Sequence, residues 1–224
     1  MISGVIFDAF GTVVRIGERT NPYRELLKHG RRQGISFDPA AFHIAMTMNL
    51  SFLELASHLG IALSPSKREE LIQALEVELS SITPFADALV AIQQLKKAGL
   101  KVGICSNLAT PYVPIVREIF RDMDGYAFSC ELGVMKPHPA IYQAVCSQMN
   151  VEPGCYFGNG AGRVLMIGDS KRCDRDGPRL VGIMGCHLDR ADSGPVNNLR
   201  QFFELVLDQN RDPRIPSFHS ITSD

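Results

Sequence analysis

The sequence has no tryptophan, no excess of either charge and no long hydrophobic run. Lysine and arginine number 23 against 24 aspartates and glutamates, which gives a formal net charge of −1 at pH 7. A general nucleic-acid binder needs a basic excess to neutralise phosphates, so we expect no nucleic-acid partner. No apolar run approaches the roughly 18 residues that a membrane-spanning helix requires, so we expect no membrane partner either.

The six cysteines also lack the spacing of a metal or redox site. None belongs to a Cys-x-x-Cys pair or has a histidine at zinc-binding spacing. The apolar segment Met1–Val14 is interrupted by Asp8 and has no cationic residues before it, so it does not resemble a signal peptide. We therefore expect reduced, mostly buried thiols in a cytoplasmic protein.

Hydrophobic residues make up 45% of the 224 residues, which is enough to bury a substantial core. The run from Gly4 to Phe7 ends at Asp8 and indicates a buried strand followed by a loop. Between about Arg15 and Ser81, apolar residues recur at helical spacing without strand-like runs, which predicts an insert of four helices. Beyond the insert, strand and helix patterns alternate, as they do in a parallel sheet with helices on both faces.

The predicted fold class is therefore α/β, with a core that is split by a helical insert. The core would comprise residues 1–14 and 85–224 and the insert residues 15–84. The chain from about residue 208 would be a mobile tail, because it has little apolar surface to bury. Strands are expected at 4–7, 100–105, 126–130, 164–167 and 180–184, and core helices at 84–99, 111–120, 139–149 and 198–207.

Three of the predicted strands end at side chains that can react or coordinate: Asp8, Ser106 and Asp169. The C-terminal ends of parallel strands lie at the same edge of a sheet, where ligands bind, so residues distant in sequence can meet there. Lys136 lies in sequence between the second and the third of these residues. We therefore expect one site that contains all four.

This set of residues indicates nucleophilic attack by a carboxylate. Asp8 would be a weak nucleophile in water, but beside a cation it can attack phosphorus or an activated carbon and form a covalent ester. Oxygen ligands from Asp8 and Asp169, with a backbone carbonyl and waters, favour Mg²⁺ as the cofactor. Ser106 would donate a hydrogen bond to an anionic substrate, and Lys136 would neutralise charge. Asp174 would orient metal-bound waters, although the dipole of a helix N-terminus also accounts for a carboxylate there.

Four segments resemble, in their order and separation, the motifs of the haloacid dehalogenase-like hydrolases. They are Phe7–Thr12, Cys105–Asn107, Met135–Pro137 and Ile167–Asp174. The resemblance covers residues 2 to about 190, and it implies a Rossmann-like core, a four-helix cap between the first two motifs and Asp8 as the nucleophile. It also implies that the catalytic positions are Asp8, Thr12, Ser106, Asn107 and Lys136, and that the metal ligands are Asp8, the carbonyl of Phe10, Asp169 and Asp174.

The first motif leaves the reaction open between two branches of the family. The phosphatases usually have a second aspartate two residues after the nucleophile, which acts as general acid and then as base. Here that position is Phe10. General acid–base help is typically worth ~10²–10⁴-fold, so its loss is a serious objection to a phosphatase. The run Asp-Ala-Phe-Gly-Thr instead resembles the 2-haloacid dehalogenases, in which halide leaves without protonation.

The fourth motif favours the opposite branch. Gly168-Asp169-Ser170 with Asp174 resembles the metal-binding form of the phosphatases, whereas the metal-free dehalogenases differ there and tend to have a tryptophan. Phe10 does not remove the metal site, because the ligand at that position is a backbone carbonyl. We therefore predict Mg²⁺-dependent hydrolysis of a small phosphate ester through an aspartyl-phosphate. The alternatives are 2-haloacid dehalogenation through an aspartyl ester, and a non-catalytic phosphate-binding member.

Substrate selection is expected in the cap and in the loop after the first motif. The residues predicted to contact the substrate are Phe10, Gly11, Arg15 and Tyr23. Solvated charge on the first cap helix explains the arginines of this stretch equally well. The partner would be a small anionic molecule, and the near-neutral composition is compatible with a monomer or a homodimer.

Overall fold

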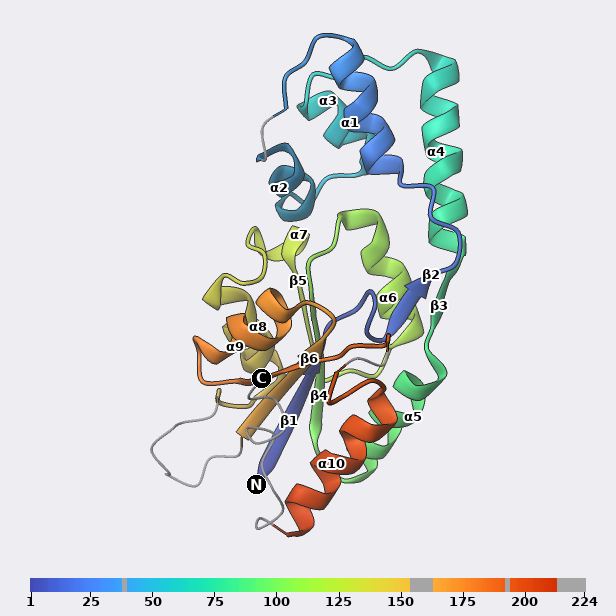
Figure 1. The fold of residues 1–224 in the computed structure, drawn as a ribbon. Coiled ribbons are helices and arrows are strands. Elements are labelled where there is room, and N and C mark those ends of the chain that lie inside the picture. The colour runs from blue at the N-terminus through green and yellow to red at the C-terminus, as the bar shows by residue number, and fades with distance from the viewer. Residues whose placement is uncertain (38–39, 154–162, 192–193, 213–224) are drawn as a thin grey trace.

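The computed structural model describes residues 1–37, 40–153, 163–191 and 194–212. Figure 1 shows a sheet with helices on both sides and, above the ends of its strands, a separate group of helices. That upper group is the insert between strands β2 (Val14–Ile16) and β3 (Ile82–Pro84). The fold class is α/β, as the alternation of strand and helix patterns predicts.

The core sheet is built, within the described residues, from five strands. They are β1 (Ile2–Phe7), β4 (Lys101–Ser106), β5 (Gly125–Phe128), β6 (Arg163–Gly168) and β7 (Met184–His187). Their order is β5-β4-β1-β6-β7, and every neighbouring pair is parallel. The chain order changes direction between β1 and β6, and in such sheets ligands bind at the carboxyl ends of the strands beside this reversal. The insert lies at the same end of the strands (Figure 1).

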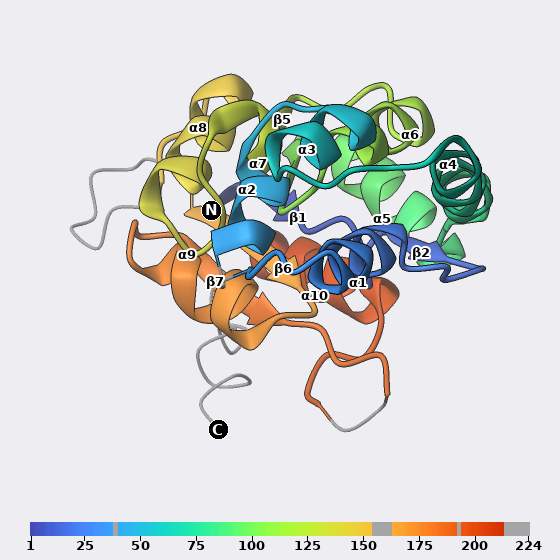
Figure 2. The same cartoon turned by 90° about the horizontal axis from the view of Figure 1, so that it is seen from above.

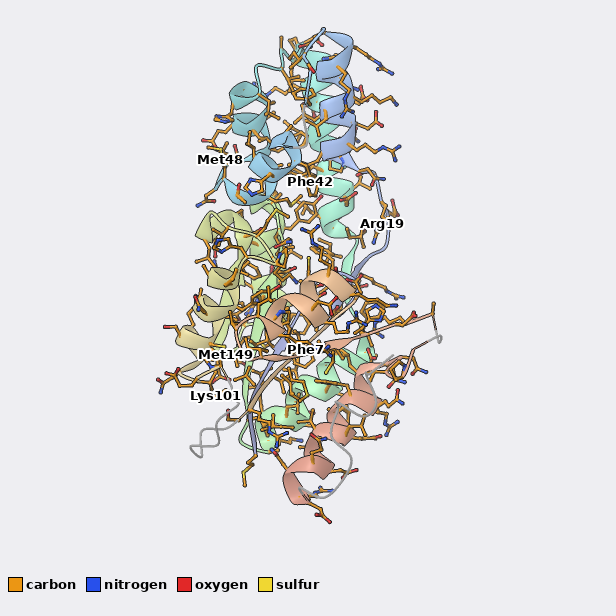
Figure 3. All side chains as sticks on the ribbon, turned by 60° about the vertical axis from the view of Figure 1, so that its left-hand side comes forward. Phe7, Arg19, Phe42, Met48, Lys101 and Met149 are labelled. Carbon is orange, nitrogen blue, oxygen red and sulfur yellow. The ribbon has the colours of Figure 1, made fainter. Side chains whose placement is uncertain are left out.

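Alternate side chains of the strands pack into two hydrophobic cores, one on each face of the sheet. Phe7 of β1 belongs to the core shared with α5 (Ala86–Lys97) and α10 (Leu199–Arg211). Ile6 belongs to the core shared with Met149 of α8 (Pro139–Met149). Phe7 and Met149, both buried, are labelled in the lower part of the molecule in Figure 3. The shorter core elements are η1 (Thr110–Tyr112), α6 (Val113–Ile119), α7 (Ser129–Leu132), the π-helical turn η2 (Lys171–Asp176) and α9 (Gly177–Arg179).

Between β2 and β3, the described part of the insert consists of four helices and the loops that connect them. Its helices are α1 (Pro22–Arg32), α2 (Ala40–Thr47), α3 (Phe52–His58) and α4 (Pro65–Ser80). Leu26, Phe52 and Leu71 are buried in its centre. Seen from above, these helices lie over the end of the core (Figure 2). The two chain segments that connect insert and core pair with each other as the antiparallel ribbon β2–β3, so both connections are held together.

Local sequence signals explain where several helices begin. Ser51 caps α3 in a capping box, in which its hydroxyl accepts from the Glu54 amide and the Glu54 carboxylate accepts from the Ser51 amide. Ser64 caps α4 and is followed by a proline at the first helical position. His138 caps α8 through Nδ1 and is also followed by proline.

Two predicted boundaries after the insert are wrong. Residues expected to open a helix at Pro84 instead end β3, and α5 begins at Ala86, because pairing with β2 keeps this segment extended. The strand expected at 180–184 begins only at Met184, because the chain first turns through Gly182 at a φ of 82°. Residues other than glycine rarely adopt this backbone conformation, so the turn at Gly182 fixes where the strand starts.

Two further predictions concern Cys130 and the C-terminus. Cys130 was expected in a strand and lies in α7, which follows β5 directly. The chain stays helical to Arg211, so a tail beginning at about residue 208 is wrong, and the residues from 213 onward lie outside the described part. Among the described residues, no helix is both long enough and apolar enough to cross a bilayer.

The packing of the insert predicts a stability difference between two leucines. Leu26→Ala should lower the free energy of unfolding by about 2–5 kcal/mol, because it leaves a cavity in the centre of the insert. Leu180→Ala makes the same change at a residue that is 73% exposed, and should cost less than about 0.5 kcal/mol. Urea unfolding followed by circular dichroism measures both, and equal losses would contradict the packing of α1.

Candidate active site

Asp8 follows the central strand β1 and is held between its two neighbouring strands. Its amide donates to the carbonyl of Ile167 in β6 at 2.9 Å. Its buried Oδ1 accepts from Oγ of Ser106, the last residue of β4, at 2.8 Å. Oγ1 of Thr12 lies 3.5 Å from Oδ2, a long hydrogen bond. Asp8 and Ser106, two of the predicted strand-end residues, are therefore in contact.

Lys136 is the buried cation of the site and is only 3% exposed. Its Nζ donates to Oδ1 of Asp8 and to Oδ1 of Asp174, both at 2.7 Å. Burial by itself lowers the pKa of a lysine, but the charges of the two aspartates outweigh it and raise the pKa of Lys136 well above its usual value. The lysine is therefore a fixed positive charge between two carboxylates.

Asn107 is connected to the site by hydrogen bonds to the backbone of Lys136. Its Oδ1 accepts from the Lys136 amide at 2.7 Å, and its Nδ2 donates to the Lys136 carbonyl at 3.2 Å. Sγ of Cys173 donates to the same carbonyl at 3.6 Å. Asn107 thus sets the position of the lysine, which is an indirect role for a residue predicted among the catalytic positions.

Asp169 and Asp174 both come from the segment after β6. Asp174 is fully buried in η2, and its Oδ2 accepts from the Ser170 amide at 2.9 Å. Gly168 permits this approach, because a Cβ there would lie 2.2 Å from Oδ2 of Asp174. Asp169 is the exposed member of the pair, and its carbonyl lies 3.1 Å from Nε2 of His187 in β7. The fourth motif therefore supplies one buried and one exposed carboxylate.

Both of these aspartates have raised pKa values. Burial raises the pKa of Asp174 to about 6, with a further contribution from the charge of Asp8 and an opposing one from Lys136. Partial desolvation and then the charge of Asp8 raise the pKa of Asp169 as well. The common cause is desolvation, which disfavours the charged carboxylate, and the negative charge of the neighbouring Asp8 adds to it.

The donor atoms of the site fit a magnesium ion. Carboxylate oxygens of Asp8, Asp169 and Asp174 lie within 4.8 Å of one another. The carbonyl of Phe10 accepts no hydrogen bond from any described residue, whereas the carbonyls on either side of it do. All of these are hard oxygen donors, which Mg²⁺ prefers over nitrogen or sulfur.

Gly11 brings the first and fourth motifs together. Its φ of 79° lies in the left-handed region, which glycine adopts without strain. A Cβ at this position would also lie 2.1 Å from Oδ2 of Asp169. The carboxylate of Asp169 therefore packs directly on the backbone of Gly11, and a larger residue here would displace it.

A cavity of about 250 Å³ opens between insert and core, with Phe10 in its wall. Tyr23 of α1 also lines it, so two of the predicted substrate contacts share this cavity. Arg15 is not among its lining residues, because its exposed side chain donates to Oγ1 of Thr83 at 3.3 Å. Gly11 is not among them either. The other apolar or aromatic walls are Ile16, Pro22, Phe42, Met46, Leu108, Ala109 and Tyr112.

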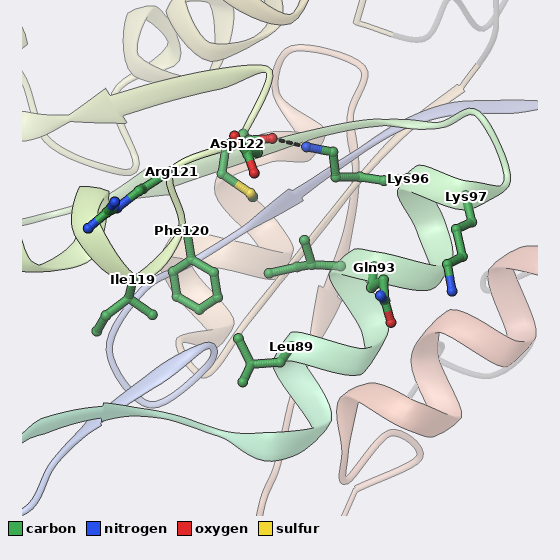
Figure 4. A pocket seen from close by; sticks show the side chains of 10 residues that line it. Leu89, Gln93, Lys96, Lys97, Ile119, Phe120, Arg121 and Asp122 are labelled. Atoms are coloured by element: carbon green, nitrogen blue, oxygen red, sulfur yellow. Dashed lines mark hydrogen bonds between the residues drawn. The ribbon is translucent and has the colours of Figure 1, made fainter.

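A second cavity, of about 500 Å³, lies between α5 and the segment at the end of α6 (Figure 4). Leu89 and Phe120 are among its walls, and Lys96 donates to the carbonyl of Asp122 at its rim. None of the predicted site residues lines this cavity. Its larger volume therefore does not make it the candidate substrate site.

Sequence reasoning missed a buried contact between insert and core. Glu78 of α4 is a carboxylate that is only 5% exposed. It accepts from Oη of Tyr112 at 2.6 Å and from the Asn21 amide at 2.8 Å. Tyr112 in turn packs edge-to-face on Phe10, with ring centroids 5.7 Å apart. One signal was available, because Glu78 follows Leu75 by three positions and so lies on the apolar face of α4.

The family model described as haloacid dehalogenase-like hydrolase matches residues 2–182. The chain belongs to this family. The predicted family membership is therefore confirmed, and the protein is a hydrolase of the haloacid dehalogenase-like type. No curated protein matches the chain.

Solved structures from both branches of the haloacid dehalogenase-like hydrolases resemble this chain. A HAD phosphatase from Thermococcus onnurineus has a TM-score of 0.62 at 20% identity, over 92% of this chain and 98% of that one. A 2-haloacid dehalogenase from Pseudomonas syringae pv. Tomato has a TM-score of 0.61 at 15% identity, over 93% and 99%. A HAD family enzyme from Bacteroides thetaiotaomicron, in complex with magnesium and inorganic phosphate, has a TM-score of 0.60 at 16% identity, over 84% and 94%. At these identities the likeness shows the fold, and a fold does not decide between two reactions.

Removal of the shared lysine should destabilise this site in a pH-dependent way. Lys136→Met leaves Asp8 and Asp174 without their cation, so we expect the free energy of unfolding to fall by about 3–5 kcal/mol at pH 8. The pKa of Asp174, which burial already raises to about 6, should rise further once the lysine is gone. The folded protein then binds protons more readily, so the loss should shrink as the pH is lowered toward 5.

Urea unfolding at pH 5, 6.5 and 8 measures this loss. Lys101→Met is the matched control, because it makes the same substitution at a surface ion pair with Asp124, and it should cost less than about 1 kcal/mol at each pH. A loss in Lys136→Met that is equal at pH 5 and pH 8 would contradict the electrostatic account of the site.

Proposed function

We propose that this hydrolase is a Mg²⁺-dependent phosphatase that acts on a small phosphate ester through an aspartyl-phosphate at Asp8. The observation that carries the proposal is the convergence of Asp8, Asp169 and Asp174 around one lysine. When all three carboxyl groups are ionised, Lys136 balances one of them and two negative charges remain. A divalent cation neutralises that remainder, and without one the cluster would repel an anionic substrate.

The residues of the site divide into direct and indirect metal contacts. Asp8, Asp169 and the carbonyl of Phe10 would hold Mg²⁺ directly. Both oxygens of Asp174 already accept hydrogen bonds, from Lys136 and from the Ser170 amide, which favours an indirect role through metal-bound water. When bound, the ion supplies charge neutralisation at the substrate phosphate.

Asp8 takes part in both covalent steps. An oxygen of Asp8 forms a bond to phosphorus while the bond to the leaving oxygen breaks, and the leaving group takes the electron pair. Lys136 and Ser106 stabilise the negative charge beside the nucleophile. Water then attacks the phosphorus of the aspartyl-phosphate, the bond between phosphorus and the Asp8 oxygen breaks, and the carboxylate of Asp8 is restored. One proton of the water stays on the released phosphate and the other passes to solvent, because Phe10 cannot accept it.

Position 10 limits the leaving group. Phe10 cannot donate a proton, and burial raises the pKa values of Tyr23 and Tyr112 in the same cavity far above their usual range. A leaving group that departs without protonation, such as a phenolate, suits these surroundings better than an alkoxide. The apolar walls suit an aromatic or alkyl body, and the volume of about 250 Å³ limits it to a small molecule.

The proposal extends to the organisation of the chain. Residues 15–84 would serve as a cap over the site and residues 1–14 and 85–224 as the catalytic core. The cavity lined by both parts and the hydrogen bond from Tyr112 to Glu78 support this division. The proposed partner is the small anionic substrate, bound by a monomer or a homodimer.

A 2-haloacid dehalogenase is the second candidate function, and Phe10 is the observation that favours it. Halide leaves carbon without protonation, so the missing acid is no obstacle to that reaction. Asp8 would attack the carbon that bears the halogen and form an aspartyl ester, which water would hydrolyse. The cluster of Asp8, Asp169 and Asp174 argues against this candidate, because dehalogenation does not require a divalent cation at Asp169.

The leading proposal predicts metal-dependent phosphate release. The wild-type protein should hydrolyse p-nitrophenyl phosphate with Mg²⁺ and lose this activity in a chelator. Asp8→Asn should reduce turnover by roughly 10³-fold or more, because it removes the nucleophile. Asp124→Asn makes the same change at a surface aspartate paired with Lys101 and should retain activity.

Phosphate release that persists in Asp8→Asn or in the chelator would refute the phosphatase proposal. Metal-independent halide release from 2-chloropropionate, lost in Asp8→Asn, would establish the second candidate instead. Binding of inorganic phosphate without either reaction would identify a non-catalytic member of the family.

The same proposal predicts a gain of function at position 10. Phe10→Asp should raise phosphatase turnover, because it places a proton donor where the phosphatases have one, and the gain should be larger for an alkyl than for an aryl phosphate. Phe10→Asn removes the same packing without supplying a proton, so it serves as the control. Equal turnover in the two variants would show that the surroundings are not arranged for that acid.

A further inference from the structure

The side chain of Arg190, which lies outside the four motifs, contacts both the segment after Asp8 and the start of α5. Arg190 lies beyond β7 and its side chain is 22% exposed. Nε donates to the carbonyl of Gly11 at 3.2 Å, and Nη2 donates to the carbonyl of Thr12 at 2.7 Å. Nη1 and Nη2 also donate to the two carboxylate oxygens of Asp87, at 3.0 and 3.1 Å. The guanidinium carbon lies 3.8 Å from the centre of the Phe85 ring.

The first two partners are consecutive carbonyls of the nucleophile loop, which we define as residues 9–14. Other carbonyls of this loop accept from backbone amides, among them Ala9 at 2.8 Å and Val13 at 3.0 Å. The carbonyl of Phe10, the proposed metal ligand, accepts none from any described residue. Arg190 therefore holds the two carbonyls that directly follow the free carbonyl of Phe10, in the loop that begins after Asp8.

The other partners lie where the chain returns from the insert. Phe85 directly follows β3, and its amide donates to the carbonyl of Val13 in the nucleophile loop at 3.0 Å. Asp87 lies in the first turn of α5, and its Oδ2 also accepts from the amide of Leu199, the first residue of α10, at 2.8 Å. The arginine is thus anchored to two core helices on one side and to the loop on the other.

We propose that Arg190 is a positioning residue for the hydrolase reaction, which fixes the nucleophile loop and couples it to the base of the insert. This inference rests on the proposed role of Asp8 as the nucleophile. A guanidinium suits the task because its planar fork bonds a carboxylate with two donors while the remaining donors reach both carbonyls. A lysine at this position has no fork and would keep the charge without keeping all four hydrogen bonds.

The chain contains a matched control in Arg117. This arginine also donates to both oxygens of a carboxylate, Glu131, at 2.8 and 2.9 Å. It also lies over an aromatic ring, 5.3 Å from the centre of Phe128. Arg117→Ala therefore removes the same kinds of interaction as Arg190→Ala, without a hydrogen bond to the nucleophile loop.

Two measurements test the proposal, one of which does not depend on turnover. Amide hydrogen exchange, followed by mass spectrometry on peptides that cover residues 9–14, should become about tenfold faster or more in Arg190→Ala. In the same variant kcat should fall about 10- to 100-fold while KM changes by less than about threefold, because the nucleophile is misplaced and the substrate cavity is intact. Arg190→Lys should lie between wild type and Arg190→Ala, and Arg117→Ala should change neither measurement.

Equal effects of Arg190→Ala and Arg117→Ala would show that Arg190 contributes only general stability, and would overturn the proposal. Faster loop exchange with an unchanged kcat, or a change confined to KM, would also overturn it. If Arg190→Ala does not fold, Asp87→Asn keeps the arginine but weakens its anchor, and should shift both measurements in the same direction. If the proposed function is wrong, Asp8→Asn retains turnover. The hydrogen-exchange comparison does not depend on turnover and still shows whether Arg190 holds the loop.

Discussion

The candidate active site depends on one buried ammonium group. Nζ of Lys136 lies 2.7 Å from an oxygen of Asp8 and 2.7 Å from an oxygen of Asp174. Burying an ion without a partner costs several kcal/mol, so the lysine and the aspartates are tolerated in the interior only together. The surrounding contacts follow from this requirement. Asn107 fixes the backbone of the lysine, and the Ser170 amide satisfies the second oxygen of Asp174.

The position of the insert places a mechanical constraint on Asp8, the proposed nucleophile. Residues 9–14 both follow Asp8 and lead into β2, the first connection to the insert. Movement of the insert would therefore displace the residues next to the nucleophile unless the core held them. The contacts that hold these residues are hydrogen bonds from the Phe85 amide and from Nε and Nη2 of Arg190. Because these contacts fix the loop from the core side, Asp8 would keep its position if the insert moved.

The sequence predicts those parts of the fold that local periodicity decides. The buried strand before Asp8, the alternation after the insert and the helical insert itself are all visible in residue spacing. The contact between Asp87 and Arg190 is not, because an acidic residue in the first turn of α5 is already explained by the helix dipole. The sequence therefore gives no reason to expect that Asp87 pairs with a residue far away in the chain. The displaced start of β7 has a similar cause, since a left-handed turn at Gly182 is a property of backbone conformation and not of residue spacing.

Phe10 connects the chemistry of the core to the packing of the insert. Its ring packs on Tyr112, whose hydroxyl donates to the buried carboxylate of Glu78 in the insert. An aspartate in its place would remove that packing and would add a fourth carboxyl group to a cluster in which Lys136 balances only one. The aromatic residue therefore gives the site an apolar wall and less negative charge, at the loss of a proton donor. For the proposed phosphatase reaction, these surroundings favour a small substrate with an apolar body and a leaving group that departs without a proton.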